Sequence, residues 1–275
     1  EVLKSALLLN PKKIVVSNFK TTYTSQIENK FKNHKNVYFL NFDDRKNPGD
    51  YRNEGVLSCF SENLLFLDSD VRVNPKTKEY IEKLLENDLD EDVIYWGIYS
   101  KFSRGMFSKI QNEILRYRFS KYFFEESIKN NKPYCGQASH FLISRKTFNK
   151  VGGFNPYLRI REDNDFCIRS VVMGIKHNLD EKFEADHLKN YNLFSDYFQK
   201  PYHASKVKVI EPNIFNKPNA QIGFKLLMSW IIFPISILIT TSFLLINSIS
   251  INNFITINLI NLILFFFFFP KKISK

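Results

Sequence analysis

The chain of 275 residues is long enough to bury a full hydrophobic core, organised as one or two domains. Its 39 lysines and arginines outnumber its 28 aspartates and glutamates, and this basic balance favours anionic partners such as nucleotides, phosphorylated lipids, membrane surfaces or nucleic acids. Its three cysteines are widely spaced and form no CxxC pair, which argues against a zinc ribbon, and we expect three reduced, buried thiols.

Strand-like and helix-like segments alternate through the first half of the chain. Short apolar and β-branched runs predict strands at 13–17, 37–40, 64–67 and 93–98. Helices are expected at 25–31, at 50–60 and from Asn74 onward, where Pro75 occupies the first turn. This alternation predicts an α/β fold, with a mostly parallel sheet and helices on both of its faces.

The following segments are a long helix, two strands and two further helices. The long helix is expected at 105–126, the strands at 141–144 and 175–179, and the further helices at 165–173 and 191–203. Basic and aromatic residues alternate around the long helix, which is compatible with single-stranded nucleic acid or with a lipid surface. We favour a solvated helix face above a buried aromatic stripe, and we expect no nucleic-acid partner.

The last part of the chain carries no charge between Leu226 and Pro270. Residues 226–246 are long enough, at about 1.5 Å per residue, to cross the hydrocarbon core of a bilayer, which is about 30 Å thick. A polar break follows, and residues 254–270 form a second apolar stretch. We expect a hairpin of two transmembrane helices, with one long or re-entrant segment as the alternative. Lysines flank both ends, and the positive-inside rule therefore places both flanks in the cytoplasm.

Two carboxylates, Asp68 and Asp70, follow the predicted strand at 64–67. In open α/β sheets, ligands bind beyond the carboxyl ends of the strands. Carboxylate oxygens at such a place suit Mg²⁺ or Mn²⁺, which can bridge phosphate oxygens. The alternative is a helix cap, or loop acids that face water.

A turn and the start of a helix precede that strand. Gly49 allows a close backbone approach, and Arg52 could bind a phosphate through two N–H groups. The alternative is an ordinary turn followed by an amphipathic helix.

A second acidic cluster, Glu162-Asp163-Asn164-Asp165, stands later in the chain. Clustered carboxyl groups raise one another's pKa, which favours a general base near neutral pH. The same acids also suit the N-terminus of a helix, and the two roles are compatible.

Taken in order, these motifs resemble the family 2 glycosyltransferases of the GT-A fold. Residues 47–70 read N-P-G-D-Y-R-N-E-G-V-L-S-C-F-S-E-N-L-L-F-L-D-S-D, which is similar to the family's Asn-x-Gly turn, Arg-Asn-x-Gly helix and Asp-x-Asp strand end. Residues 135–155 resemble its acceptor-side segment, and the second acidic cluster resembles its acidic motif. The resemblance covers about residues 10–205. It implies a nucleotide-diphospho-sugar transferase fold with a mixed, mostly parallel sheet and flanking helices, joined to the C-terminal transmembrane helices.

The resemblance also implies a role for each matching residue. Asp68 and Asp70 would hold a divalent cation, Mg²⁺ or Mn²⁺, and His187 falls where some members place a further metal or phosphate ligand. Asp163 would be the general base, while Glu162 and Asp165 would orient the acceptor or tune the base. The expected nucleotide-sugar contacts are Asn18, Asn47, Gly49, Arg52, Asn53, Asp68 and Gly153. The turn at Gly153 reads equally well as a floor beneath the donor sugar and as a plain turn anchored by Phe154.

The chain departs from the family pattern near its start. The family's opening strand, its Pro-x-x-Asn turn and the helix after it are not recognisable, and we therefore expect a truncated start. The second family strand usually ends in an acidic pair, and here Ser17 and Asn18 stand in its place. Asn18 can still bind a base or a ribose through hydrogen bonds.

The expected organisation is a catalytic domain at 1–205, a basic juxtamembrane segment at 206–225 and a transmembrane hairpin at 226–270. The resemblance implies an inverting, metal-dependent hexosyltransferase. It would move a sugar from a nucleotide-sugar to a lipid-linked glycan or polysaccharide at the cytoplasmic face of the cell membrane. The alternatives are transfer to a polyprenyl phosphate, which needs no strong base, and a non-catalytic membrane-anchored relative that binds nucleotide or glycan.

Overall fold

The computed structural model describes residues 1–86, 89–129, 136 and 138–189, together with short helical pieces at 238–239, 241 and 255–259. The chain divides into two compact units, Glu1–Ile214 and Phe215–Lys275. Among the described residues, no helix has the length and apolar character needed to cross a bilayer. The predicted spans at 226–246 and 254–270 lie mostly outside those residues, and the predicted helix at 191–203 lies wholly outside them.

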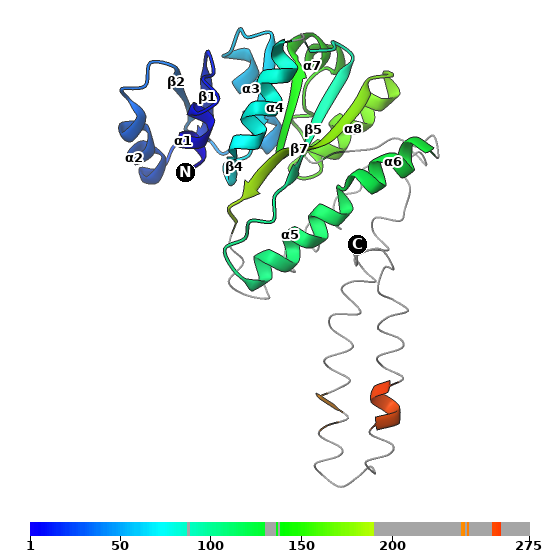
Figure 1. The fold of residues 1–275 in the computed structure, drawn as a ribbon. Helices are drawn as coiled ribbons and strands as arrows, with labels where there is room; N and C mark the ends of the chain where they lie inside the picture. Colours follow the sequence, from blue (N-terminus) through cyan, green and yellow to red (C-terminus); the bar gives the residue numbers. More distant parts are fainter. Residues whose placement is uncertain are drawn as a thin grey trace. The chain divides into compact units, whose positions relative to one another are not determined.

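The first unit is an α/β structure whose elements are drawn in Figure 1. Its helices are α1 (Val2–Leu7), α2 (Thr22–Phe31), α3 (Pro48–Leu57), α4 (Pro75–Glu86), α5 (Met106–Arg118), α6 (Lys121–Lys129), α7 (Arg145–Val151) and α8 (Glu162–Val172). Its strands are β1 (Ile14–Phe19), β2 (Val37–Phe42), β3 (Asn63–Leu67), β4 (Val71–Val73), β5 (Val93–Tyr99), β6 (His140–Ser144) and β7 (Lys176–His187). The strands expected at 13–17, 37–40, 64–67, 93–98 and 141–144 are confirmed, with ends that differ by at most two residues.

Other boundaries were wrong. The long helix expected at 105–126 is two helices, α5 and α6, and the short elements β4 and α7 were not expected. The strand expected at 175–179 continues to His187. Its extension was hidden because charged residues separate the few buried side chains, Phe183 and Ala185 among them.

Two sheets are present among the described strands. β1 and β2 form a parallel pair, and the second sheet has the order β3-β6-β5-β7-β4. In that sheet β5 and β7 are parallel, whereas β6 runs antiparallel to both β3 and β5, and β4 runs antiparallel to β7. The expectation of a mixed sheet is confirmed, but the expectation that it is mostly parallel is wrong for the five-stranded sheet. Apolar runs predict where strands lie and not in which direction they run.

Helices cover both faces of the five-stranded sheet, as expected. Alternate residues of β3, β5 and β6 point to opposite faces. On one face Phe66, Trp96 and Phe141 pack with residues of α3, α7 and α8. On the other face Tyr95 and Leu142 pack with residues of α4. The sheet therefore carries a hydrophobic core on each face. Polar side chains that could bind a ligand are found beyond the ends of its strands.

Two cysteines lie among the described residues. Cys59 is a buried free thiol, whereas Cys167 is disulfide-bonded. The expectation of three reduced thiols is therefore wrong for Cys167. Sequence alone does not specify which cysteines a fold brings together.

Candidate active site

The turn Asp68-Ser69-Asp70 crosses the end of the five-stranded sheet. The Asp68 N–H donates to the carbonyl oxygen of Ser139 at 2.8 Å, just before β6. The carbonyl oxygen of Asp70 accepts from the N–H of Leu188 at 2.7 Å, just after β7. Backbone hydrogen bonds at both ends thus hold the turn in place, and they position two carboxylates beyond the strand ends, where ligands of such sheets bind.

One arginine of α3 connects the two acidic clusters. Arg52 Nη2 lies 2.8 Å from Asp68 Oδ1, and Arg52 Nη1 lies 2.7 Å from Glu162 Oε1. We call these three side chains the Arg52 junction. The guanidinium carbon lies 5.1 Å from the centre of the Phe154 ring, within range of a cation–π contact. Arg52 was expected to contact a phosphate, and in this structure it pairs with two carboxylates instead.

The electrostatics of the Arg52 junction favour additional positive charge. Burial raises the pKa of Asp68, and the Arg52 guanidinium opposes that rise while the negative charges of Asp70 and Asp163 reinforce it. Burial and the charge of Asp163 raise the pKa of Glu162 in the same way, again against Arg52. Burial alone would lower the pKa of Arg52, but its two carboxylate partners raise it above the ordinary value. Two carboxyl groups therefore pair with one guanidinium, and the negative charges of Asp70 and Asp163 act on that pair of carboxyl groups.

The first turn of α8 holds the second acidic cluster, as the sequence predicted. Arg161 caps this helix in the left-handed region, with a φ of 65° that costs a non-glycine residue about 1 kcal/mol or more. Glu162 is buried against Arg52, whereas Asp163 is half-buried, and its carboxylate accepts the N–H of Asn164 at 2.8 Å. Within this cluster, Glu162 is therefore the carboxylate that pairs with Arg52.

Asp165 stabilises a neighbouring turn. Its carboxylate accepts two hydrogen bonds from Arg169, at 2.9 and 2.8 Å. Arg169 in turn donates to the carbonyl oxygens of Val151 and Gly153, at 2.5 and 2.7 Å. The direct partner of Asp165 is thus the arginine that fixes the Gly153 turn, and any contact with an acceptor stays a prediction.

Several residues that were expected to contact the nucleotide-sugar join α3 to the Gly153 turn. Asn53 holds the backbone of Phe154 with two hydrogen bonds of 2.8 and 2.9 Å, and Asn47 donates to the carbonyl oxygen of Pro156 at 2.8 Å. A Cβ atom at Gly49 would lie 3.0 Å from the Phe154 Cβ. Gly153 has a φ of +70°, which favours glycine, and a Cβ there would lie 2.9 Å from Asn53 Oδ1. These residues shape the site, and a direct donor contact by them stays a prediction.

Asp70 and His187 face each other at the ends of their strands. The distance between Asp70 Oδ2 and His187 Nε2 is 3.6 Å. Two ligand atoms that each lie about 2.1 Å from one divalent cation stand about 3 Å apart, so this pair fits such an ion with a small closure. Within the described part of the chain, no three His, Cys, Asp or Glu side chains gather into a complete metal site. Asp68, expected as a third protein ligand, pairs with Arg52.

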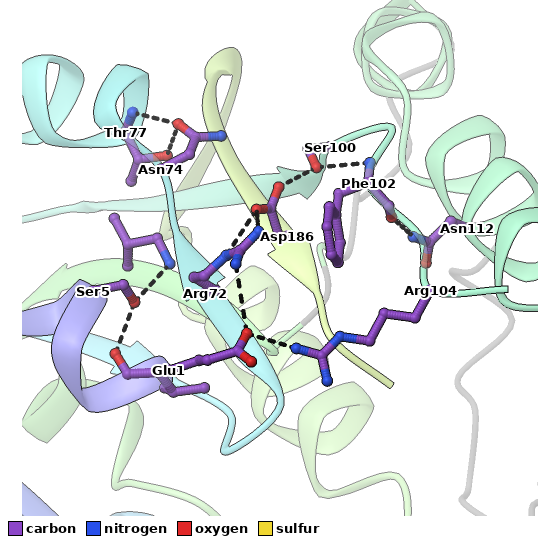
Figure 2. Close-up of polar contacts among 12 residues, drawn as sticks. Glu1, Ser5, Arg72, Asn74, Thr77, Ser100, Phe102, Arg104, Asn112 and Asp186 are labelled. Carbon is purple, nitrogen blue, oxygen red and sulfur yellow. Dashed lines mark hydrogen bonds and ion pairs between the residues drawn. The ribbon is translucent and has the colours of Figure 1, made fainter. Parts of the chain in front are cut away.

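A second arginine assembly beside His187 was not expected from the sequence. Arg72 Nη2 lies 2.7 Å from Asp186 Oδ2, and Arg72 Nη1 lies 3.5 Å from Glu1 Oε2. We call these three side chains the Arg72 junction. Asp186 also accepts a hydrogen bond from Ser100, at 2.5 Å. The ring of Phe102 lies beside Arg72 (Figure 2). No local spacing could have revealed this assembly, because its members come from β4, β7 and the segments before α1 and after β5.

Asn18 lies at the end of β1 with part of its amide unpaired. Its Nδ2 donates to Asn41 Oδ1 at 2.8 Å, and Asn41 donates to Glu28 at 2.9 Å. The Asn18 Oδ1 and the Ser17 Oγ are buried and have no hydrogen-bond partner among the described residues. Leaving a buried acceptor unpaired costs about 1–3 kcal/mol, so this place suits a ligand that brings N–H or O–H donors.

Comparisons with known proteins agree with this geometry. The sequence profile of the family described as "Glycosyltransferase like family 2" matches residues 3–210. No curated protein matches the chain at a significant level.

Similar solved structures include S. aureus TarS 1–349 in complex with UDP-GlcNAc, with a TM-score of 0.52 and 17% identity over 98% of this chain and 69% of that one. The mannosyltransferase PcManGT from Pyrobaculum calidifontis, in complex with GDP-Man and Mn²⁺, has a TM-score of 0.50 and 11% identity over 71% of this chain and 54% of that one. GalNAc-T7 with UDP, GalNAc and Mn²⁺ has a TM-score of 0.50 and 14% identity over 70% of this chain and 41% of that one. The chain thus spans about half the length of the PcManGT chain. At identities this low, the structural similarity shows a shared fold and nothing further.

Proposed function

The chain belongs to the glycosyltransferase-like family 2 and has a GT-A-like α/β fold, and from this premise we propose that it transfers a sugar, with inversion, from a nucleotide-sugar to a hydroxyl group of a glycan. The observation that carries the proposal is the Arg52 junction. It joins Asp68, just after β3, to Glu162, at the start of α8, through one guanidinium. Groups suited to the leaving diphosphate and a group suited to the acceptor proton therefore meet in one place.

Asp163 is the general base in this proposal. As the acceptor oxygen forms its bond to the anomeric carbon, the bond from that carbon to the diphosphate oxygen breaks, and the hydroxyl proton passes to the Asp163 carboxylate. Glu162 is less suited to that task, because Arg52 occupies it and it is buried. A single displacement of this kind inverts the configuration at the anomeric carbon, and a positioned base contributes about 10²- to 10⁴-fold to the rate.

Asp70 and His187 are the residues we expect to hold Mg²⁺ or Mn²⁺. When bound, a divalent cation neutralises the charge that develops on the leaving diphosphate. The facing pair and the excess of carboxyl groups around Arg52 support this expectation. Two similar structures, PcManGT and GalNAc-T7, contain Mn²⁺ and also support it.

The acceptor in this proposal is a lipid-linked glycan or polysaccharide at the cytoplasmic face of the cell membrane. The charge-free stretch between Leu226 and Pro270, with lysines on both sides, supports a membrane location. Nucleotide-sugars are available on the cytoplasmic side. Transfer to a polyprenyl phosphate is less favoured, because that acceptor is already an anion and would not need Asp163 as a general base.

A transfer assay tests the proposal. The full chain is supplied with UDP- or GDP-sugars and Mn²⁺, and with a lipid-linked sugar or a polyprenyl phosphate as acceptor. We expect transfer to the lipid-linked sugar and a loss of about 100-fold or more in the Asp163→Asn variant. Asp92→Asn serves as the control, because Asp92 is exposed and its carboxylate pairs with Lys150 and with no candidate site residue in the described part of the chain. Full activity of Asp163→Asn would overturn the role of the base, and donor binding without turnover would favour a non-catalytic relative.

A further inference from the structure

Asn112, in the middle of α5, contacts the candidate metal ligand His187 across the fold. Its side-chain Oδ1 lies 3.1 Å from His187 Nδ1, although 75 residues separate the two in the sequence. Asn112 is only 2% exposed and His187 only 4% exposed. A buried amide inside a helix lowers stability unless its polar groups are satisfied, and the contact with His187 satisfies one of them.

The second hydrogen bond of Asn112 determines which way its amide points. Asn112 Nδ2 donates to the backbone carbonyl oxygen of Phe102, which can only accept (Figure 2). The opposite amide orientation would place two oxygens against each other. The atom that faces His187 is therefore the amide oxygen, which also can only accept.

This orientation selects one tautomer of His187. Because Asn112 Oδ1 accepts, His187 Nδ1 must carry the hydrogen and donate it. The neutral ring then has its lone pair on Nε2, the atom that faces Asp70 Oδ2 at 3.6 Å. A ring nitrogen that binds a metal must offer a lone pair, and the partner of the other nitrogen decides which one does.

We propose that Asn112 is a positioning residue for the metal centre: its amide oxygen holds His187 in the tautomer and orientation that direct Nε2 and Asp70 toward one divalent cation. This inference rests on the proposed function for the presence of the cation. The role of Asn112 itself rests on its two hydrogen bonds and its burial.

Other contacts hold the ring in the same place. The His187 ring stacks on Tyr99, with the ring centres 4.5 Å apart and the planes 9° from parallel. The carbonyl oxygen of Tyr99 accepts a hydrogen bond from Arg116 of α5 at 2.5 Å. Two residues of α5, one turn apart, thus fix the ring from its edge and from the residue on which it stacks.

The segment that joins β5 to α5 completes the connection. Asn112 fixes Phe102 through its carbonyl oxygen, and the Phe102 ring lies 4.7 Å from the guanidinium carbon of Arg72. Arg72 pairs with Asp186, the residue before His187. Consecutive residues of β7 are therefore held from the same segment, which makes α5 part of the scaffold of the metal centre.

Manganese binding to the full chain, without donor or acceptor, tests the proposal. In Asn112→Leu, which is similar in size and cannot accept a hydrogen bond, we expect the Kd for Mn²⁺ by isothermal titration calorimetry to rise about 10-fold or more. In Asn112→Asp, which keeps an accepting oxygen toward His187 but loses the hydrogen bond to the Phe102 carbonyl, we expect a Kd between those of the wild type and Asn112→Leu. Glu113→Gln, at the exposed neighbouring position, is the matched control, and its Kd is expected to stay unchanged.

Nitrogen-15 spectra of the His187 ring provide the second measurement, and they need no metal or activity. We expect the Nδ1–H tautomer in the wild type and its loss in Asn112→Leu. An Nε2–H tautomer in the wild type would overturn the proposal even if Asn112→Leu failed to fold. An unchanged Mn²⁺ affinity in folded Asn112→Leu would also overturn it, provided that His187→Ala abolishes binding. If His187→Ala binds Mn²⁺ as the wild type does, the metal centre of the proposed function is wrong, and this inference falls with it.

Discussion

The Arg52 and Arg72 junctions have the same composition and different surroundings. Each has one guanidinium between two carboxylates and over a phenylalanine ring, at 5.1 Å from Phe154 in the first and 4.7 Å from Phe102 in the second. The side chains of Arg52 and Glu162 are 16% and 10% exposed and that of Asp68 is 38% exposed, whereas those of Arg72, Asp186 and Glu1 are 32%, 13% and 53% exposed. The same chemical groups are therefore expected to contribute very differently to stability.

Burial is the reason for this difference. An exposed ion pair contributes about 0–1 kcal/mol, because water and salt screen its charges. Removing one partner of a buried pair leaves an uncompensated charge out of water and costs about 3–5 kcal/mol. The Arg52–Glu162 pair lies near the second limit, because both side chains are largely buried, whereas the Arg72–Glu1 pair lies nearer the first.

The largest expected effect is that of Arg52→Met. This change leaves Asp68 and Glu162 close together without their shared cation, and we expect a loss of about 4 kcal/mol in the free energy of unfolding. Sugar transfer should fall with it, since both acidic clusters lose their common partner. Urea unfolding at pH 7 measures the first effect, and a variant as stable as wild type would show that the junction is not a buried pair.

His140, buried at the start of β6, provides a pH dependence. Burial lowers the pKa of His140 from its ordinary 6.5 to about 4, so the unfolded chain binds a proton that the folded chain does not. The contribution of neutral His140 to the free energy of unfolding is complete above pH 6.5. It is lost as the pH falls toward 4, which lowers the free energy of unfolding by about 3 kcal/mol. Urea unfolding across this range measures the loss. An equal loss in His140→Gln, whose side chain does not titrate, would contradict the assignment.

The turn beside the Arg52 junction can be tested through its glycine. Gly153→Ala introduces a side chain at a φ of +70° and 2.9 Å from Asn53 Oδ1, and we expect a loss of about 2 kcal/mol by thermal unfolding. Gly174→Ala is the matched control, because Gly174 has a φ of +74° and nothing within 4 Å of an added Cβ. We expect about 1 kcal/mol there, from the backbone alone. Equal losses in the two variants would show that the Asn53 contact does not constrain the turn.

The smallest expected effect is that of Arg72→Met. Asp186 keeps its hydrogen bond from Ser100, and the half-exposed Glu1 keeps its pair with Arg104, so we expect a loss of about 1 kcal/mol in the free energy of unfolding. The measurement is the same urea unfolding as for Arg52→Met. If the two variants lose equal stability, burial does not separate the two junctions.

Local patterns predicted much of the fold and part of the site. The strand before Asp68 and the helix expected at 165–173 were visible, because apolar runs and acidic first turns act over a few residues, although that helix begins three residues earlier, at Glu162. The antiparallel course of β6, the extension of β7 to His187 and the disulfide at Cys167 were not visible. They depend on which distant segments pair, and no local pattern records that.

By itself, the sequence determined the family and the positions of both acidic clusters, because these follow from the order and spacing of motifs along the chain. Only the tertiary structure decided how those motifs are used. It paired Arg52 with Asp68 and Glu162, turned Asp165 toward the arginine that holds the Gly153 turn, and placed Asn112 against His187. The physical reason is that charge pairing and the choice of a histidine tautomer act over a few ångströms between groups that the chain separates by many residues.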